Sequence, residues 1–159
     1  MNKPQTKQTI NIFLSGGMTN LSEEEATEWR QDIIDYFSLT NVYIKCFDPT
    51  KNFSTNQSFE DFSKELEFMY NKIALTHDLH LLSNSDVVIC NLNSPNSIGT
   101  AQELFYAYEH NIPIIILCPE ETIPHMWYQI ESQLIVTYTP DNFMETVDSV
   151  ASVIYSMFF

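Results

Sequence analysis

One eleven-residue stretch, Asn93–Glu103 (NSPNSIGTAQE), combines a turn, a helix start and a carboxylate at a spacing that could do chemistry. A helix capped by Asn96 or Ser97 directs its free backbone amides and the positive end of its dipole at whatever lies before it. Glu103 falls about one turn into that helix, and Gly99 allows a close approach to the backbone. A serine cap and an early glutamate are also routine stabilising choices, so the spacing alone leaves the role of Glu103 open.

Asp78 is a second acidic residue of interest, in a long helical pattern that also carries His77 and His80. Two carboxyl groups can divide the roles of nucleophile and acid between them. The plain alternative for Asp78 is a solvated carboxylate on a helix surface. The two histidines lack a convincing third ligand, so no metal site is expected.

The charge balance excludes one large class of function. The chain has 21 Asp and Glu against 7 Lys and Arg, a formal net charge of −14, and Arg30 is its single arginine. Nucleic-acid polymers are bound largely through phosphate neutralisation by Lys and Arg, so we expect no DNA or RNA binding. The same shortage weighs against highly phosphorylated substrates.

The cysteines and the N-terminus point to a cytoplasmic protein. Cys46, Cys90 and Cys118 each lie in or at the end of an apolar run, without a C-x-x-C spacing, which predicts buried thiols in a reducing compartment. The first nine residues are polar, and no apolar run approaches the roughly 20 residues of a membrane span.

The elements that must position the acidic residues alternate between short apolar runs and longer helical patterns. This alternation predicts an α/β fold, an open doubly wound (Rossmann- or flavodoxin-like) parallel sheet of about five strands with helices on both faces. Strands are expected at 10–15, 42–47, 86–92, 112–118 and 134–138, with helices beginning at Ser22 and covering roughly 59–79, 98–110, 125–133 and 142–155. One domain would span 10–159 after a disordered or extended segment 1–9.

Two further expectations concern packing. In the helix that carries Glu103, we expect Leu104, Phe105 and Tyr108 to face the sheet. The aromatic end of the chain, 153–159, would be sticky in water, so we expect it to pack on the core or in a subunit interface.

Five motifs, taken together, resemble the nucleoside 2-deoxyribosyltransferase family over roughly residues 10–155. They are Phe13–Met18 (FLSGGM), Asp78, Ser85–Leu92 (SDVVICNL), Ser97–Glu103 (SIGTAQE) with Ala107-Tyr108, and Ile112–Ile116 (IPIII). The Gly-Thr-Ala-x-Glu helix after a Ser-Asp-Val-Val strand is fairly specific, and the order and spacing of the motifs strengthen the match.

The resemblance implies a mechanism. Glu103 would attack the anomeric carbon of a deoxyribosyl group and displace the base, while Asp78 would assist the departure of the base; no cofactor is needed. Substrate contacts would come from Ser15, Gly16, Gly17, Met18, Asp48, Asn93, Ser97, Gly99 and Thr100. The partners would be a nucleoside or nucleotide and a nucleobase.

The resemblance also implies a homodimer or a higher symmetric oligomer whose neighbouring subunits complete each site. His125, Met126 and Trp127 fall where a neighbour would approach. Phe53 and Phe59 could stack on a base, although a core role is as good an explanation for them.

The chain departs from the transferase pattern at Ser97. Classical transferases carry an acidic residue six positions before the nucleophile, whereas a serine there binds phosphate in the related deoxynucleoside 5′-monophosphate N-glycosidases. The scarcity of basic residues in the loops argues the other way. We therefore favour deoxyribosyl transfer between nucleobases, with nucleotide hydrolysis as the alternative and a non-catalytic nucleotide-ligand binder as a third reading.

Overall fold

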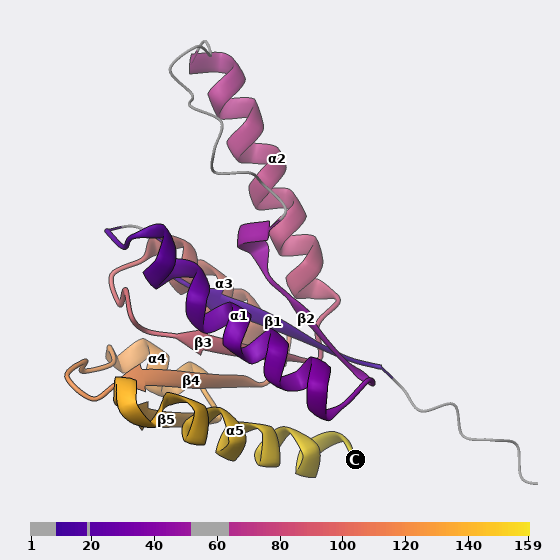
Figure 1. The fold of residues 1–159 in the computed structure, drawn as a ribbon. Helices are drawn as coiled ribbons and strands as arrows, with labels where there is room; N and C mark the ends of the chain where they lie inside the picture. Colours follow the sequence, from indigo (N-terminus) through magenta and orange to yellow (C-terminus); the bar gives the residue numbers. More distant parts are fainter. Residues whose placement is uncertain (1–8, 19, 52–63) are drawn as a thin grey trace, which may run out of the picture.

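The computed structural model describes residues 9–18, 20–51 and 64–159, and these form a five-stranded parallel sheet with helices on both faces (Figure 1). The strand order is β2-β1-β3-β4-β5. The strands are β1 (Ile10–Gly16), β2 (Ile44–Phe47), β3 (Val87–Asn91), β4 (Ile114–Pro119) and β5 (Leu134–Tyr138). The helices are α1 (Glu23–Thr40), α2 (Lys64–Ser83), α3 (Ile98–Glu109), α4 (Met126–Glu131) and α5 (Phe143–Phe158), with short 3-10 turns at Pro49–Lys51 and Pro140–Asn142. The predicted fold class is confirmed.

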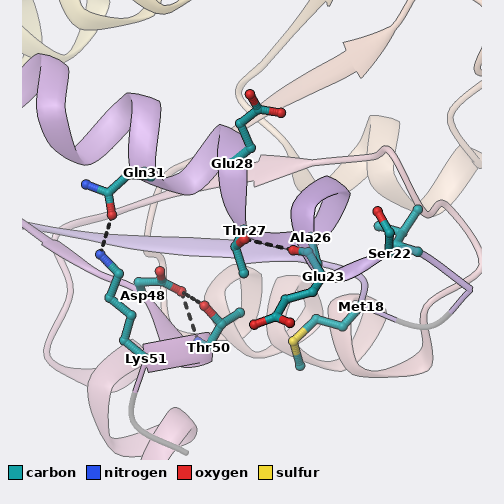
Figure 2. A pocket seen from close by; sticks show the side chains of 11 residues that line it. Met18, Ser22, Glu23, Ala26, Thr27, Glu28, Gln31, Asp48, Thr50 and Lys51 are labelled. Carbon is teal, nitrogen blue, oxygen red and sulfur yellow. Dashed lines mark hydrogen bonds between the residues drawn. The ribbon is translucent and has the colours of Figure 1, made fainter. Parts of the chain in front are cut away.

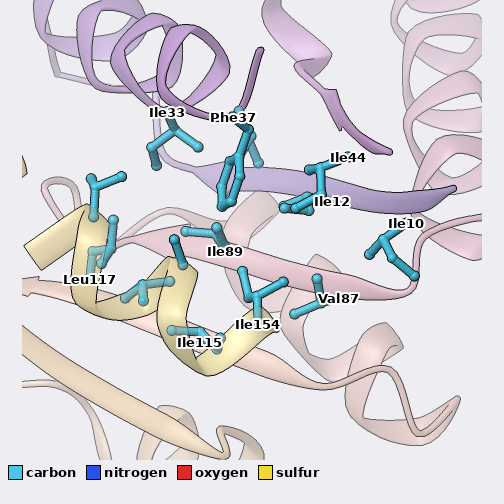
Figure 3. Packing of buried hydrophobic residues seen from close by; sticks show 14 of the residues in the cluster. Ile10, Ile12, Ile33, Phe37, Ile44, Val87, Ile89, Ile115, Leu117 and Ile154 are labelled. Atoms are coloured by element: carbon cyan, nitrogen blue, oxygen red, sulfur yellow. The ribbon is translucent and has the colours of Figure 1, made fainter. Parts of the chain in front are cut away.

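The sheet separates two apolar clusters because successive strand side chains point to opposite faces. On one face α1 and α5 cover a cluster built around Ile12, Ile89 and Ile115 (Figure 3). On the other face the end of α2, together with α3 and α4, covers a cluster that includes Phe13 and Cys90. Along β1, Leu14 belongs to the first cluster and Phe13 to the second, so the alternation places Ser15 on the α3 face.

The order of the strands fixes where a ligand would bind. From β1 the chain moves outward to β2, and from β3 it moves the other way to β4 and β5. The carboxyl ends of β1 and β3 are therefore the switch point of the sheet, which is where open α/β sheets bind ligands. The loop after β1 and the turn before α3 both begin there.

Strand β4 starts at Ile114 rather than at residue 112, and two further details of the predicted elements are wrong. Strand β2 starts at Ile44 rather than at residue 42, because the side chain of Asn41 accepts a hydrogen bond from the Tyr43 amide (2.9 Å) and holds a turn there. In α3, Leu104 and Ala107 face the sheet, whereas Phe105 and Tyr108 are about half exposed. Leu104 and Ala107 are three positions apart and share a helix face, whereas Phe105 lies about 100° further round.

Helix α2 projects from the rest of the molecule (Figure 1). Leu82, near its carboxyl end, is its one buried residue within the described part. Leu66, Met69 and Ile73, which made the helical pattern recognisable, are each more than half exposed. Phe53 and Phe59 lie outside the described residues.

The C-terminal residues pack back on the molecule. Ile154 is fully buried in the α1–α5 cluster, and Tyr155 and Phe158 are partly buried against it, while Phe159 is more than half exposed. This matches the core-packing half of the prediction for 153–159. None of the helices within the described ranges has both the length and the apolar character needed to cross a membrane.

Candidate active site

Glu103 is held at the sheet by a short hydrogen bond. The hydroxyl of Ser15, a fully buried residue near the end of β1, donates to Oε2 of Glu103 at 2.5 Å. Burial raises the pKa of Glu103 to about 7; the Ser15 bond and the Arg30 charge oppose that rise, and the Asp78 charge adds to it. A largely buried carboxylate with one oxygen fixed in this way is oriented before any substrate arrives.

Asp78 on α2 is the second acidic group of the site. Burial raises its pKa to about 6, and His77, with Nδ1 at 3.9 Å from Oδ1 of Asp78, partly offsets the rise. Because the charge of Asp78 also raises the pKa of Glu103, the two carboxyl groups lie near enough to influence each other.

The loop after β1 lies tightly against the turn before α3. A Cβ on Gly17 would come within 2.6 Å of the Cβ of Ser94 and 2.9 Å of that of Ser97, so only glycine fits there. Ser97 is the N-cap of α3, and its Oγ accepts a hydrogen bond from the Thr100 amide (3.3 Å). These contacts hold the loop after β1 against the start of α3 at the switch point of the sheet.

Gly99 and Thr100 lie in the first turn of α3, directly after Ser97 and Ile98. Thr100 is buried, and its hydroxyl has no hydrogen-bond partner in the described part of the chain. At Gly99 an added Cβ would meet only Ser97 Oγ, at 3.9 Å, so the helix backbone is approachable from that side.

Two other predicted contact residues, Met18 and Asp48, line a cavity of about 590 Å³ between the start of α1 and the end of β2 (Figure 2). Asp48 Oδ1 accepts hydrogen bonds from the amide (2.9 Å) and hydroxyl (2.6 Å) of Thr50. Glu103 is not among the described residues that line this cavity. This cavity and the two acidic groups therefore occupy different places, and the acidic groups are the ones that carry reactive atoms.

Asn93 also lies apart from Glu103. Its side-chain amide donates to the Glu25 carbonyl (3.0 Å), which ties the turn after β3 to the first turn of α1. It lines a second cavity of about 580 Å³ on the α1 and α5 side of the sheet. The structure thus brings Ser15, Glu103 and Asp78 together, and places Asp48 and Asn93 at neighbouring positions around the strand ends.

Sequence reasoning assigned no role to two buried residues next to this group. Arg30, which lies directly after buried Trp29 on α1, has its guanidinium against the end of β1. Cys90 on β3 interacts with Ser15 and Glu103, and burial raises the pKa of its thiol, so it remains a neutral thiol rather than a competing nucleophile. Within the described ranges, no three His, Cys, Asp or Glu side chains are grouped to hold a metal ion.

Solved structures share the fold of this chain, but at low sequence identity. No family model and no curated protein sequence matches the chain. Among solved structures, a 2-deoxyribosyltransferase from Bacillus psychrosaccharolyticus superposes with a TM-score of 0.62 at 17% identity, covering 85% of this chain and 90% of the other. The chain has the fold of the 2-deoxyribosyltransferases. This agrees with the family resemblance of the sequence motifs.

Two further structures share this deoxyribosyltransferase-like fold. A conserved protein from Enterococcus faecalis V583 gives a TM-score of 0.60 at 13% identity over 89% of this chain and 98% of the other. The CMP N-glycosidase BcmB from Clostridium botulinum gives 0.52 at 15% identity over 90% of this chain and 98% of the other. At such identities the likeness is one of fold.

Proposed function

We propose that the protein cleaves the N-glycosidic bond of 2′-deoxynucleosides and transfers the deoxyribosyl group to another nucleobase. The observation that carries the proposal is the hydrogen-bonded Glu103 carboxylate, fixed by Ser15 at the switch point with Asp78 close by. A carboxylate positioned in this way, with a second carboxyl group near it, is the arrangement of a double-displacement glycosyl transfer.

The proposed deoxyribosyl transfer has two half-reactions. An oxygen of ionised Glu103 bonds to C1′ while the C1′–N bond breaks, and the bonding pair leaves with the base, which takes a proton from Asp78. The nitrogen of a second base then attacks C1′, Glu103 departs as a carboxylate, and the proton of the incoming base passes to Asp78. Each step inverts C1′, so the product keeps the original anomeric configuration.

A second candidate is hydrolysis of (deoxy)nucleoside 5′-monophosphates to the free base. Ser97 at the N-terminus of α3 favours it, and so does the Thr100 hydroxyl, which has no hydrogen-bond partner among the described residues, since hydroxyl groups at a helix start suit an anion. The CMP N-glycosidase among the structural neighbours is consistent with it. In this case water takes the place of the second base.

Product analysis by chromatography separates these candidates. The purified protein is incubated with each deoxynucleoside, and separately with each 5′-monophosphate, with and without a free acceptor base. Glu103→Gln is the test variant, and Glu109→Gln, an exposed glutamate on the same helix, is the matched control. A new nucleoside that forms only with acceptor base supports transfer, and free base from monophosphates alone supports hydrolysis. Inert wild type would favour a non-catalytic binding protein instead.

The exposed apolar side chains of α2 support a homo-oligomer. Met69 and Ile73 lie four positions apart on a helix that projects from the molecule, both are more than half exposed, and soluble monomers rarely leave a large apolar patch exposed. We expect a light-scattering mass of a dimer or a larger assembly, and a monomeric mass at micromolar concentration would contradict this. The cytoplasmic location stays a prediction.

A further inference from the structure

Arg30, the only arginine of the chain, is completely buried at the end of β1. Its Nη2 donates to the Gly16 carbonyl at 2.8 Å, and its Nε donates to the Leu14 carbonyl at 3.4 Å. Its Nη1 donates to the Ala26 carbonyl of its own helix. The guanidinium therefore binds the backbone on both sides of Ser15.

These carbonyls need a partner because β1 is longer than its neighbour β2. The last β1–β2 pair is Phe13 with Phe47, whereas the pairing with β3 continues to Gly16. Asp48, the first residue after β2, has Oδ1 3.7 Å from Nε of Arg30. Arg30 thus occupies the place where a longer β2 would have supplied hydrogen-bond donors, and its planar, rigid fork suits two carbonyls on one strand edge.

We propose that Arg30 is a positioning residue for Glu103, which acts by fixing the β1 end so that the Ser15 hydroxyl points at the carboxylate. The role of Glu103 as nucleophile rests on the proposed function; the contact chain from Arg30 through Ser15 to Glu103 does not. These contacts are the hydrogen bonds from Arg30 to the Leu14 and Gly16 carbonyls and the 2.5 Å hydrogen bond from Ser15 to Glu103. A loose β1 end would release the fixed oxygen of the carboxylate.

Arg30 also acts on Glu103 through space, and the two routes are separable. Its positive charge lowers the pKa of Glu103, and so does the Ser15 hydrogen bond. Arg30→Lys keeps the charge and loses the fork, whereas Ser15→Ala removes the hydroxyl and leaves Arg30 in place. A residue that acts through Ser15 should matter little once Ser15 is gone.

The test is a double-mutant cycle with Ser15→Ala, Arg30→Lys and the double variant. The readouts are kcat, KM and the midpoint of the Glu103 carboxyl titration by ¹³C NMR, assigned with Glu103→Gln. We expect each single variant to lose about tenfold in kcat with little change in KM, and to raise the Glu103 midpoint. The double variant should fall within about twofold of Ser15→Ala. Losses that multiply, or an unmoved Glu103 midpoint in Arg30→Lys, would overturn the proposal.

The NMR titration reports on the contact chain even if the protein turns out to catalyse nothing, so the two proposals fail separately. Should Arg30→Lys not fold, the wild type suffices, because a single arginine gives one unambiguous set of ¹⁵N guanidinium signals. We expect separate, slowly exchanging Nη signals and an Nε signal that moves with the Glu103 midpoint. A single averaged Nη signal, together with an Nε signal that does not change as Glu103 titrates, would overturn the proposal that Arg30 positions Glu103.

Discussion

The two carboxyl groups of the site lie on helices that are held very differently. Glu103 is on α3, which buries Leu104 and Ala107 against the central strands, and one of its oxygens is hydrogen-bonded to β1. Asp78 is on α2, which projects from the molecule and buries only Leu82 among its described residues. The proposed nucleophile thus lies on the more deeply packed helix, and the proposed proton donor on the less buried one.

This difference has a physical logic. Covalent attack on carbon needs the nucleophile within a few tenths of an ångström of one geometry. A proton donor can tolerate more variation, because hydrogen bonds accept a range of distances and angles. The deeper packing of α3 therefore suits the proposed nucleophile, and the less buried α2 suits the proposed acid.

The largest expected effect on kcat comes from removing the Glu103 carboxylate, the more rigidly held of the two acidic groups. Glu103→Gln keeps the shape and the Ser15 contact but cannot form the covalent intermediate, so we expect kcat to fall by at least about 10³-fold. Base release by chromatography measures it, with Glu109→Gln as the control. Activity within tenfold of wild type would mean that another group is the nucleophile.

A smaller loss should follow from removing the acid. Asp78→Asn should lower kcat by about 10²-fold, the lower range for general acid catalysis. The loss should shrink for 7-methyl-2′-deoxyguanosine, whose base already carries a positive charge and leaves without protonation. An equal loss on both substrates would argue that Asp78 binds rather than protonates.

The pH dependence of kcat/KM tests the roles proposed for Glu103 and Asp78. An ionised Glu103 is needed, so kcat/KM should fall as pH drops, and a protonated Asp78 is needed, so it should fall as pH rises. With pKa values of about 7 and about 6, the profile should be a narrow bell that peaks between them. Asp78→Asn should abolish the alkaline fall. A flat wild-type profile from pH 5 to 8 contradicts this assignment.

The smallest effect concerns stability. Folding raises the pKa of Glu103 from 4.5 to about 7, so the fold loses stability as pH rises through that window and the buried carboxylate ionises. Glu103→Gln should therefore raise the melting temperature by about 2–4 °C at pH 8 and by less at pH 5. Asp78→Asn, at a more exposed site with a smaller shift, should raise it less. Calorimetry at both pH values decides, and a destabilised Glu103→Gln at pH 8 would contradict the burial argument.

The elements of the fold were accessible from the sequence, but the contacts between them were not. Apolar runs predicted all five strands, with the bounds of β5 matching and the start of β2 wrong. Ser15 and Glu103 are 88 positions apart, and only the register of β1 against its neighbours brings them together. The same register explains Arg30, because its burial depends on how far β1 extends past β2.

Helical periodicity did not predict which apolar side chains of α2 and α3 are buried. An apolar pattern identifies a helix without saying how much of it the molecule covers, which is why Ile73 on α2 and Phe105 on α3 are exposed. How much of a helix is buried depends on the shape of the sheet beneath it and on the length of the helix. A local sequence pattern does not report either of these. Glu103, in contrast, was singled out by the family resemblance of its motif together with the other motifs, because local spacing alone left its role open.

Arg30, a side chain of α1, supplies the hydrogen-bond donors for the Leu14 and Gly16 carbonyls that a longer β2 would otherwise supply. The segment after β2 reaches this arrangement through Asp48, whose Oδ1 lies 3.7 Å from Nε of Arg30. We therefore expect that the connection beyond Asp48 can be lengthened, shortened or exchanged while the Glu103 carboxylate keeps its place, provided that Asp48 itself is kept. The outer edge of the sheet would then be the part that tolerates variation at the lowest risk to the proposed site.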